Sequence, residues 1–171
     1  MPPNNPQPTI ESATRDDLET VTDLWVQLAR DQRRHESAVR AAPNRETMHE
    51  TLAAYQINDG LIVARLAGEI VGFASVTIER GSLELDSTRG LLSNIYVEPA
   101  FRDRGIGTAL LAAAEEVAAD RDADELLLEV MATNEAARRF YRREGYDEFR
   151  VTMARSLENR DENDTPSKED G

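Results

Sequence analysis

The order of apolar segments predicts an α/β fold, a sandwich in which a twisted, mostly antiparallel sheet carries helices on both faces. Three observations lead to this prediction. An apolar run at 91–97 passes through a glycine-bearing loop into a strong helix former, and a second strand-then-helix pattern follows from 126 to 144. Before them, 61–79 has the pattern of two strands around a tight turn, which is typical of a hairpin.

The chain ahead of this hairpin is predicted to form one short strand and two helices. The strand is expected at 9–13, and Thr14 with Asp17 three residues later resembles a capping box that begins the first helix. Apolar residues at helical spacing predict its core face at Leu18, Val21, Trp25 and Leu28. The second helix is expected from 44 to 56, with one side formed by Met48, Leu52 and Tyr55.

The rest of the chain alternates strands with helices. In order, we expect strands at 61–66 and 69–79, a polar connection at 80–90, a strand at 91–97, a helix from 106, a strand at 126–131, a helix at 134–144 and a strand at 147–155. The helix from 106 is expected to bury Ile106, Leu110, Ala113 and Val117. The strands on either side of this helix should form the one clearly parallel pair, because the helix can serve as their crossover connection.

Length and composition favour a single folded domain. A chain of 171 residues suffices for one core, which we place at 9–155. The proline-rich residues 1–8 and the acidic residues 156–171 are expected to be disordered. The absence of cysteine excludes a disulfide framework, a thiolate zinc site and a cysteine nucleophile. Because no apolar run reaches membrane-spanning length and no signal-peptide pattern is present, we expect a soluble, cytoplasmic protein with no membrane partner.

The charge of the chain bears on its partners. A net charge of −13 disfavours general binding of nucleic acid, whereas a cationic acceptor such as an amine would be attracted. The basic residues are nineteen arginines and one lysine, Lys168. Such an excess of acid with so little lysine resembles the proteins of salt-loving organisms, and it is also compatible with an acidic protein from a GC-rich genome.

The loop between the strand at 91–97 and the following helix has the character of an anion site. A helix start presents unpaired backbone N–H groups and the positive end of the helix dipole, which suit a phosphate or pyrophosphate. Gly105 and Gly107 would let the backbone come close to such an anion. An ordinary turn between strand and helix is the alternative. A nucleotide phosphotransferase loop is disfavoured, because no Gly-Lys-Ser/Thr follows the glycines.

Two motifs together resemble the GCN5-related N-acetyltransferase (GNAT) family. The strand ending in Val97-Glu98-Pro99 precedes a loop that matches the family's acyl-CoA loop at Arg102, Gly105 and Gly107. A later helix matches the family's Asn-x-x-Ala-x-x-Phe/Leu-Tyr pattern at Asn134, Ala137, Phe140 and Tyr141. The resemblance covers 9–155 and is sharpest from 91 to 146. It implies a three-layer α/β/α sandwich whose central parallel strands splay apart, with acyl-CoA in the gap.

The resemblance also implies which residues meet the cofactor and what reaction follows. The residues expected to bind acetyl-CoA are Ile95, Tyr96, Val97, Arg102, Asp103, Arg104, Gly105, Ile106, Gly107, Thr108, Asn134, Ala137 and Phe140. The implied reaction is direct transfer of an acetyl group from acetyl-CoA to a primary amine, of a protein N-terminus or a small molecule, in a ternary complex without a metal. An acetyl-cysteine intermediate is impossible in a chain without cysteine.

Each catalytic role has a candidate. Tyr141 stands at the family's tyrosine position and is the candidate acid for the leaving thiolate, with a packed core tyrosine as the alternative. The backbone N–H of Val97, near the β-bulge that the family places there, is the candidate oxyanion donor. Asn134 is expected to cap its helix as well as touch the cofactor.

The general base has two candidates. Glu129 lies in a Leu-Glu-Val triplet that resembles the ribosomal-protein alanine acetyltransferase branch, where that glutamate serves as base. Its alternative is a polar residue on the exposed face of a strand. Glu98 is the rival candidate, and its alternative is a solvated residue before a proline.

Two broader questions stay open from the sequence. A catalytically silent acyl-CoA-binding regulatory module is the alternative to an enzyme, although the retained Tyr141 argues for turnover. The protein is either a monomer or a homodimer, since a free edge strand could pair across a two-fold axis.

Overall fold

The computed structural model describes residues 6–79 and 83–158, and in this part of the chain it confirms the α/β sandwich. Most of the two ends expected to be disordered, 1–8 and 156–171, and part of the polar connection at 80–90 lie outside the described residues. The strands are β1 (Thr9–Ser12), β2 (Leu61–Leu66), β3 (Glu69–Ile78), β4 (Arg89–Val97) and β5 (Glu125–Leu128). The α-helices are α1 (Leu18–Gln32), α2 (Arg45–Ile57), α3 (Ile106–Asp120) and α4 (Glu135–Arg143).

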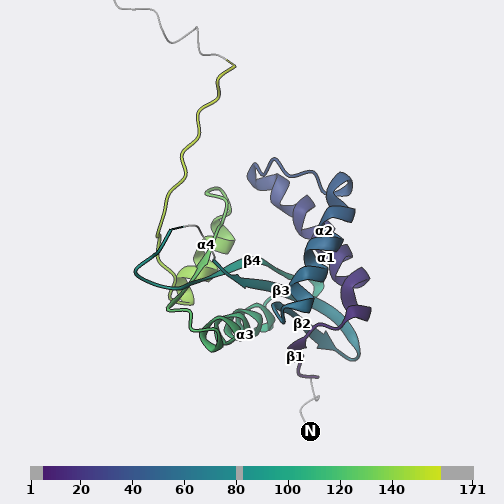
Figure 1. Cartoon of the computed structure of the whole chain (residues 1–171). Helices are drawn as coiled ribbons and strands as arrows, with labels where there is room; N and C mark the ends of the chain where they lie inside the picture. Colours follow the sequence, from purple (N-terminus) through teal and green to yellow (C-terminus); the bar gives the residue numbers. More distant parts are fainter. Residues whose placement is uncertain (1–5, 80–82, 159–171) are drawn as a thin grey trace, which may run out of the picture.

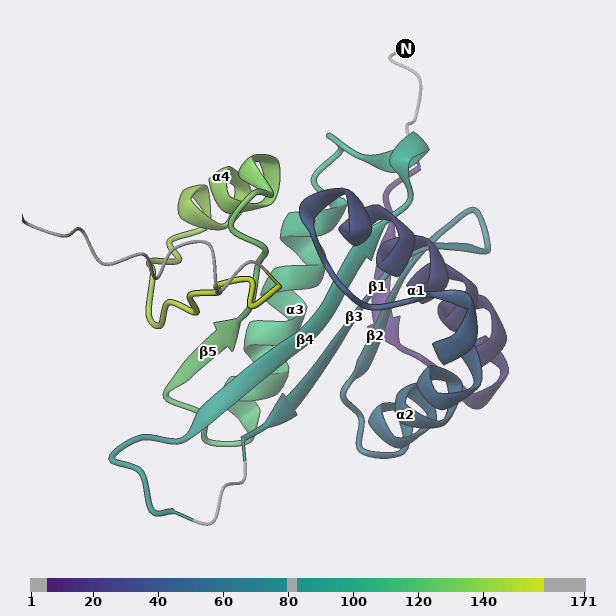
Figure 2. The same ribbon diagram turned by 90° about the horizontal axis from the view of Figure 1, so that it is seen from above.

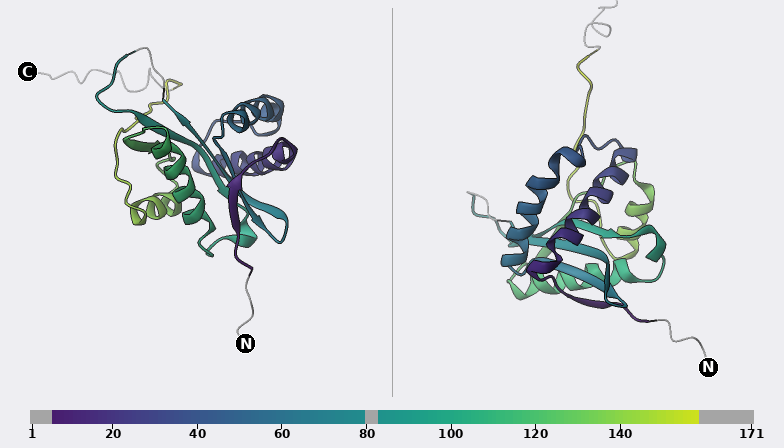
Figure 3. Two further views of the ribbon diagram at one scale, coloured as in Figure 1. Left: turned by 60° about the horizontal axis from the view of Figure 1, so that its bottom comes forward. Right: turned by 90° about the vertical axis from the view of Figure 1, so that its right-hand side faces the viewer.

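The five strands form one sheet in chain order, from β1 at one edge to β5 at the other. The pairs β1–β2, β2–β3 and β3–β4 are antiparallel, and β4–β5 is the parallel pair that the sequence predicts. The turn between β2 and β3 has positive φ at both Ala67 and Gly68, as a tight hairpin turn of type I′ requires. Helices α1 and α2 cover one face of the sheet, and α3 and α4 lie on the other (Figures 1–3).

Two apolar cores flank the sheet. The first core contains all four predicted positions of α1, with Trp25 as one of its buried members, together with Leu52 of α2. Asp17 stabilises the start of α1 as expected, since its carboxylate accepts a hydrogen bond of 2.8 Å from the Thr14 backbone N–H.

The second core lies between the sheet and α3, and it corrects one prediction. Ile106 and Leu110 are buried as expected, but the rest of the buried face of α3 is Leu111, Ala114 and Ala118. Ala113 and Val117 are only partly buried at its margin. The reason is that α3 is apolar over most of its surface, so the spacing of its apolar residues is compatible with more than one buried face.

The largest difference from the sequence prediction is at the C-terminal side. Residues 147–155, predicted to be a strand, form no secondary structure, and β5 ends at Leu128 and not at Met131. Alternation of apolar residues fixes which side chains share a face, but a strand also needs a neighbour with which to exchange hydrogen bonds. In the part of the chain that the structure describes, β5 has only β4 as a neighbour. No helix in the described ranges is long and apolar enough to cross a membrane.

Candidate acyl-CoA and acceptor site

The parallel strands β4 and β5 separate from each other before β4 ends. They pair only from Arg89 opposite Glu125 to Leu92 opposite Leu128. Strand β4 then continues to Val97, while β5 has already ended. Among the described residues, the carboxyl half of β4 therefore has no strand on this side, which is the splayed arrangement expected from the sequence. Ligands of α/β proteins commonly bind at such carboxyl ends of parallel strands.

The backbone of Val97 is directed into the space left by β5. The Glu98 N–H donates to the Val71 carbonyl of β3 at 2.9 Å, so Glu98 faces β3. Because hydrogen-bonding direction alternates along an antiparallel strand, the N–H and C=O of Val97 face the opposite side. The Val97 carbonyl there accepts a hydrogen bond of 2.9 Å from Arg102 Nε. The Val97 N–H therefore points into the gap, which is the direction that an oxyanion donor to a bound group would need.

The β-bulge in β4 lies elsewhere than predicted. Asn94 is opposite Ser75 and Leu92 is opposite Val76, so Ser93 is the extra residue. The bulge is therefore centred at Ser93 and does not adjoin Val97. A bulge leaves little trace in a sequence, because any residue that tolerates the local twist can occupy it. What the bulge does is set the direction of the N–H groups that follow it along β4.

Helix α3 begins at this gap without a side-chain cap. Its N-cap residue Gly105 has φ of 80°, in the left-handed region, and no side chain there accepts a hydrogen bond from the first turn. The first helical hydrogen bond runs from Ala109 N–H to the Gly105 carbonyl at 3.1 Å. The N–H groups of Ile106, Gly107 and Thr108 consequently have no partner inside the helix. Together with the helix dipole they form a site that suits an anion.

The two glycines of this loop differ in their roles. A Cβ atom at Gly105 would meet nothing within 4 Å, so it is the positive φ that favours glycine. At Gly107 a Cβ atom would lie 3.6 Å from Cζ of Phe140, which is an ordinary van der Waals contact. Gly107 therefore marks the place where α4 packs on the start of α3.

The predicted loop arginines point in different directions. Arg102 lies over the ring of Tyr96, with 5.4 Å between Cζ and the ring centroid, and its Nη2 is 3.4 Å from the carboxylate of Asp31 on α1. Arg104 lies over Phe101 at 5.5 Å. Arg102 thus ties the loop to the α1 side of the site, so positive charge at the loop is supplied by exposed Arg104 and by the helix end.

Tyr141 is packed among aromatic rings on the α3 side of the sheet. Its ring centroid lies 5.2 Å from that of Phe140 and 6.0 Å from that of Tyr146. Burial raises the pKa of Tyr141 to about 12, because the apolar surroundings disfavour a phenolate. The hydroxyl therefore keeps its proton at neutral pH, as an acid must before it acts.

Asn134 caps α4 as predicted. Its side-chain oxygen accepts a hydrogen bond of 3.2 Å from the Ala137 N–H, which satisfies an amide of the first turn. This contact fixes the direction of the helix that carries Phe140 and Tyr141.

The two candidate bases are not distinguished by their contacts. Glu129 is exposed and comes directly after β5, whereas Glu98 is half-buried between the end of β4 and Pro99. Neither carboxylate takes part in an ion pair within the described ranges. Among the described residues, neither carboxylate forms a hydrogen bond with Tyr141.

The structure adds contacts that the sequence did not reveal. The buried Tyr96 donates a hydrogen bond of 3.2 Å to Gln27 of α1, and burial followed by the charge of Asp31 raises its pKa. Ser93, the bulge residue, shares a hydrogen bond of 2.6 Å with the Tyr55 hydroxyl of α2. The partners in each contact lie far apart in sequence, so no local pattern could have revealed them.

A contact also closes one end of the splayed region. The hydroxyl of Thr133, just before α4, donates a hydrogen bond of 3.1 Å to the carbonyl of His35, just after α1. The segment after β5 therefore touches the segment after α1 across the outer end of β4.

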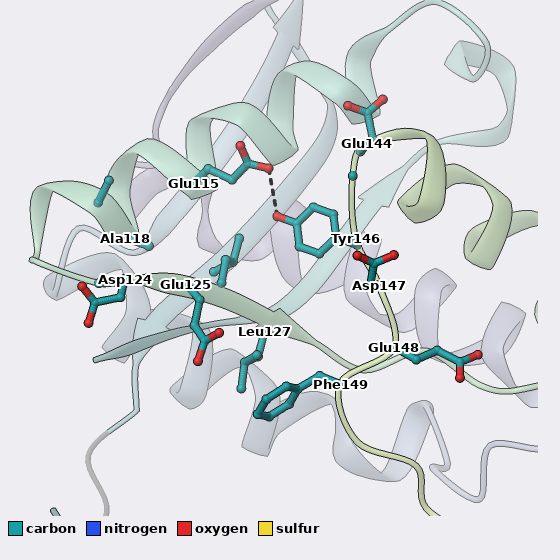
Figure 4. A pocket seen from close by; sticks show the side chains of 14 residues that line it. Glu115, Ala118, Asp124, Glu125, Leu127, Glu144, Tyr146, Asp147, Glu148 and Phe149 are labelled. Carbon is teal, nitrogen blue, oxygen red and sulfur yellow. Dashed lines mark hydrogen bonds between the residues drawn. The ribbon is translucent and has the colours of Figure 1, made fainter. Parts of the chain in front are cut away.

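A cavity of about 520 Å³ lies on the other side of β5, between α3 and the chain after α4 (Figure 4). Its lining includes several carboxylates, and Tyr146 donates a hydrogen bond of 2.8 Å to Glu115 within it. None of the residues predicted to bind cofactor lines this cavity. Its acidic lining does not suit an anionic ligand. Among the described residues, no cluster of three or more His, Asp or Glu is arranged to hold a metal ion.

Two relatives named as N-acetyltransferases are similar to this chain in sequence. An uncharacterized N-acetyltransferase of Archaeoglobus fulgidus is 39% identical over 83 residues, 48% of this chain and 56% of its own length. An N-alpha-acetyltransferase of Sulfurisphaera tokodaii is 35% identical over 95 residues, 52% of this chain and 57% of its own. The match thus spans about half the length of these relatives.

The fold itself is shared with a solved acetyltransferase structure. An aminoglycoside N-acetyltransferase, AAC(6')-Iy in complex with CoA, superposes with a TM-score of 0.72 at 21% identity, covering 92% of this chain and 99% of that one. Residues 22–146 match the sequence pattern of the Acetyltransferase (GNAT) family. Because this match includes well over half of the 171 residues, the chain belongs to the GNAT family of acetyltransferases.

Proposed function

We propose that this protein is an N-acetyltransferase that moves the acetyl group of acetyl-CoA directly onto a primary amine. One observation carries the proposal: the uncapped N-terminus of α3 and the freed backbone of Val97 lie at the same end of the splayed β4–β5 pair. A ligand with an anionic group at one end and a reactive carbonyl at the other matches such a site. Acetyl-CoA is a molecule of this kind, and the fold neighbour AAC(6')-Iy was solved with CoA.

The backbone would do most of the binding. The N–H groups of Ile106, Gly107 and Thr108, which have no side-chain cap, would receive the pyrophosphate, with Arg104 adding charge at the rim. The N–H groups of Ile95 and Val97 face the gap and can hold the extended part of the cofactor as a neighbouring strand would. Acetyl-CoA supplies the activated acetyl group, and Val97 would stabilise the negative charge on its carbonyl oxygen.

Proton transfer would involve side chains at two places. The amine attacks only in its neutral form, and a lysine or α-amino group is mostly protonated at neutral pH. Glu129 or Glu98 would remove the proton, directly or through water, and Tyr141 would protonate the departing thiolate. The raised pKa of Tyr141 keeps its proton available until that moment.

An assay of the full chain with acetyl-CoA and a panel of amines tests the proposal. The panel contains peptides with free N-termini, polyamines and aminoglycosides, and the readouts are release of free thiol and the mass of the product. We expect one acetylated amine per thiol released with at least one acceptor class. Binding of acetyl-CoA in calorimetry without transfer to any amine would instead support a silent regulatory module.

The base can be assigned with two matched variants. If Glu129 is the base, Glu129→Gln loses rate near neutral pH and recovers partly as pH rises, because more of the amine is then neutral by itself. Glu98→Gln is the control and stays near the wild-type rate. The reverse pattern assigns the role to Glu98, and two normal variants mean that the acceptor arrives neutral.

A further inference from the structure

Within the described residues, the side chain of Arg102 makes two polar contacts, and both bind it to other elements of the fold. Its Nε donates a hydrogen bond of 2.9 Å to the Val97 carbonyl at the end of β4, and its Nη2 lies 3.4 Å from a carboxylate oxygen of Asp31 on α1. Its Cζ atom also lies 5.4 Å from the centroid of the Tyr96 ring. These contacts commit the guanidinium to β4 and α1, since hydrogen bonds from a charged donor are stronger than neutral ones.

The contact with Val97 completes the hydrogen bonding of a peptide group at the end of β4. The N–H of this peptide, which belongs to Glu98, donates to the Val71 carbonyl at 2.9 Å, and its carbonyl, which belongs to Val97, accepts from Arg102. In the part of the chain that the structure describes, no strand lies on the gap side of Val97. Arg102 therefore supplies the donor that a neighbouring strand would otherwise supply, and the peptide is held from both sides.

Holding this peptide also restricts the proposed oxyanion donor. The Val97 N–H belongs to the preceding peptide group, and only the two backbone torsions of Val97 separate the two planar groups. If the Val97 carbonyl had no partner, the end of β4 could rotate about these torsions, and the direction of the N–H could change with them. An oxyanion donor is effective because its direction is fixed before the reaction begins. The contact from Arg102 contributes to that fixed direction.

Arg102 is itself held in place from α1. Gln27 and Asp31 are four residues apart on this helix, so they lie on the same face of it. Asp31 contacts the guanidinium directly, and Gln27 accepts a hydrogen bond of 3.2 Å from the hydroxyl of Tyr96, whose ring lies against the guanidinium. Tyr96 is only 5% exposed, so its ring is a fixed surface for the cation. The position of Arg102 therefore depends on α1 as well as on its own loop.

We propose that Arg102 is a positioning residue for the Val97 N–H and that Asp31 holds Arg102 in place for this role. The inference rests on the proposed acetyl transfer, and it assigns Arg102 to the rate of that reaction and not to the binding of acetyl-CoA. The family resemblance instead placed Arg102 among the residues that bind the cofactor. Binding of the pyrophosphate is then left to the first turn of α3 and to Arg104.

Replacing arginine by lysine separates these two roles. Arg102→Lys keeps the positive charge that a phosphate needs, but an ammonium group lacks the planar set of donors that contacts Val97 and Asp31 together. We expect kcat to fall by about tenfold at an unchanged Kd for acetyl-CoA, which is less than the roughly 10²–10³-fold loss caused by removing an oxyanion donor itself. Arg104→Gln is the contrasting variant and should raise this Kd with a smaller effect on kcat. A wild-type kcat in Arg102→Lys would overturn the proposal.

Variants of Asp31 test whether this residue acts through Arg102. Asp31→Asn should lower kcat at an unchanged Kd for acetyl-CoA, and Asp31→Glu, which keeps a carboxylate, should recover part of the rate. Combining Asp31→Asn with Arg102→Lys should cause no further loss, because the two residues act as one unit. Asp23→Asn is the matched control, since it breaks an ion pair between α1 and Arg45 of α2 and should keep the wild-type kcat. Losses that add in the double variant would contradict the role of Asp31.

A measurement on the protein without cofactor tests the contact itself. Hydrogen exchange of the Glu98 amide, followed by NMR, should be faster in Arg102→Lys and Asp31→Asn than in the wild type, and unchanged in Asp23→Asn. The same exchange rate in all of these proteins would overturn the proposal. If the wild type transfers no acetyl group, the proposed function is wrong and the positioning role is wrong with it. An active wild type with a normal kcat in Arg102→Lys contradicts the positioning role alone.

Discussion

The molecule contains two successive strand–loop–helix units, and they differ in how their helices begin. In the first, β4 has nine residues and leads into the 15-residue α3, whose first turn has no side-chain cap. In the second, β5 has four residues and leads into the nine-residue α4, whose first turn is capped by Asn134. The first-turn N–H groups of α3 are therefore available to a ligand. In α4 the Ala137 N–H instead donates to the side chain of Asn134.

The helices of the two units also differ in how many residues they bury, and this difference matches the different roles proposed for them. Helix α3 buries five residues in the core, whereas α4 has none that is fully buried. The first unit is held by the core and would bind with its backbone. The second unit packs on the first through Phe140 and would contribute the side chain of Tyr141.

The largest effect is expected from the side chain carried by the second unit. Tyr141→Phe keeps the ring packing and removes only the proton donor, so turnover should fall by about 10²–10⁴-fold with acetyl-CoA affinity nearly unchanged. Steady-state kinetics and calorimetry measure the two quantities. Tyr146→Phe is the matched control, because its hydroxyl binds Glu115 on the cavity side. Equal losses in both variants would mean that Tyr141 acts only by packing.

The pH dependence of stability tests the burial of the same tyrosine. The pKa of Tyr141 is raised from 10.0 to about 12 in the folded protein, so its ionisation favours the unfolded chain. This stabilising contribution is complete below pH 10 and is lost as pH rises from 10 toward 12, at about 1.4 kcal/mol per unit. Urea unfolding should therefore show a steeper loss above pH 10 for wild type than for Tyr141→Phe. Parallel losses would indicate that the ring is solvated.

A backbone change in the first unit should have the next largest effect. Gly105→Ala places a Cβ atom on a residue with φ of 80°, which costs about 1–2 kcal/mol in the left-handed region. Strain at the N-cap should weaken acetyl-CoA binding by about tenfold. Gly107→Ala is the control, since its Cβ would make an ordinary contact with Phe140. If Gly107→Ala weakens acetyl-CoA binding more than Gly105→Ala, the affinity depends on the space at residue 107 and not on the backbone conformation of residue 105.

The smallest effect is expected at the cap of the second unit. Asn134→Ala removes the hydrogen bond to the Ala137 N–H and should lower the free energy of unfolding by about 1 kcal/mol. Asn134→Asp retains an acceptor oxygen and should lose much less. Thermal unfolding of both variants measures the difference. A loss of acetyl-CoA affinity in Asn134→Ala at unchanged stability would assign Asn134 to the cofactor.

The features predicted from the sequence are those that depend on neighbouring residues. The helical spacing of Leu18, Val21 and Trp25, the Ala67-Gly68 turn and the cap by Asn134 are all confirmed, because each is determined within a few residues. The hairpin of β2 and β3 and the parallel pairing of β4 with β5 followed from the tight turn and the helix that connect these strands. The family was recognised from two motifs whose residues lie in such local contexts.

The features that were missed depend on distant parts of the chain. Whether 147–155 forms a strand depends on a partner edge, and the bulge at Ser93 depends on the register with β3. The attachment of Arg102 to Asp31 joins residues 71 positions apart. Roles for Glu129 and Glu98 stay predictions, because they depend on where an acceptor sits.

Hydrogen exchange at the start of the two helices tests whether the uncapped end of α3 is the anion site. Backbone amides are followed by NMR with and without saturating acetyl-CoA. We expect slower exchange and shifted resonances at Ile106, Gly107 and Thr108, with little change at the first amides of α4. Binding that leaves these three α3 amides unchanged would contradict it, because the uncapped helix end would then not be the anion site.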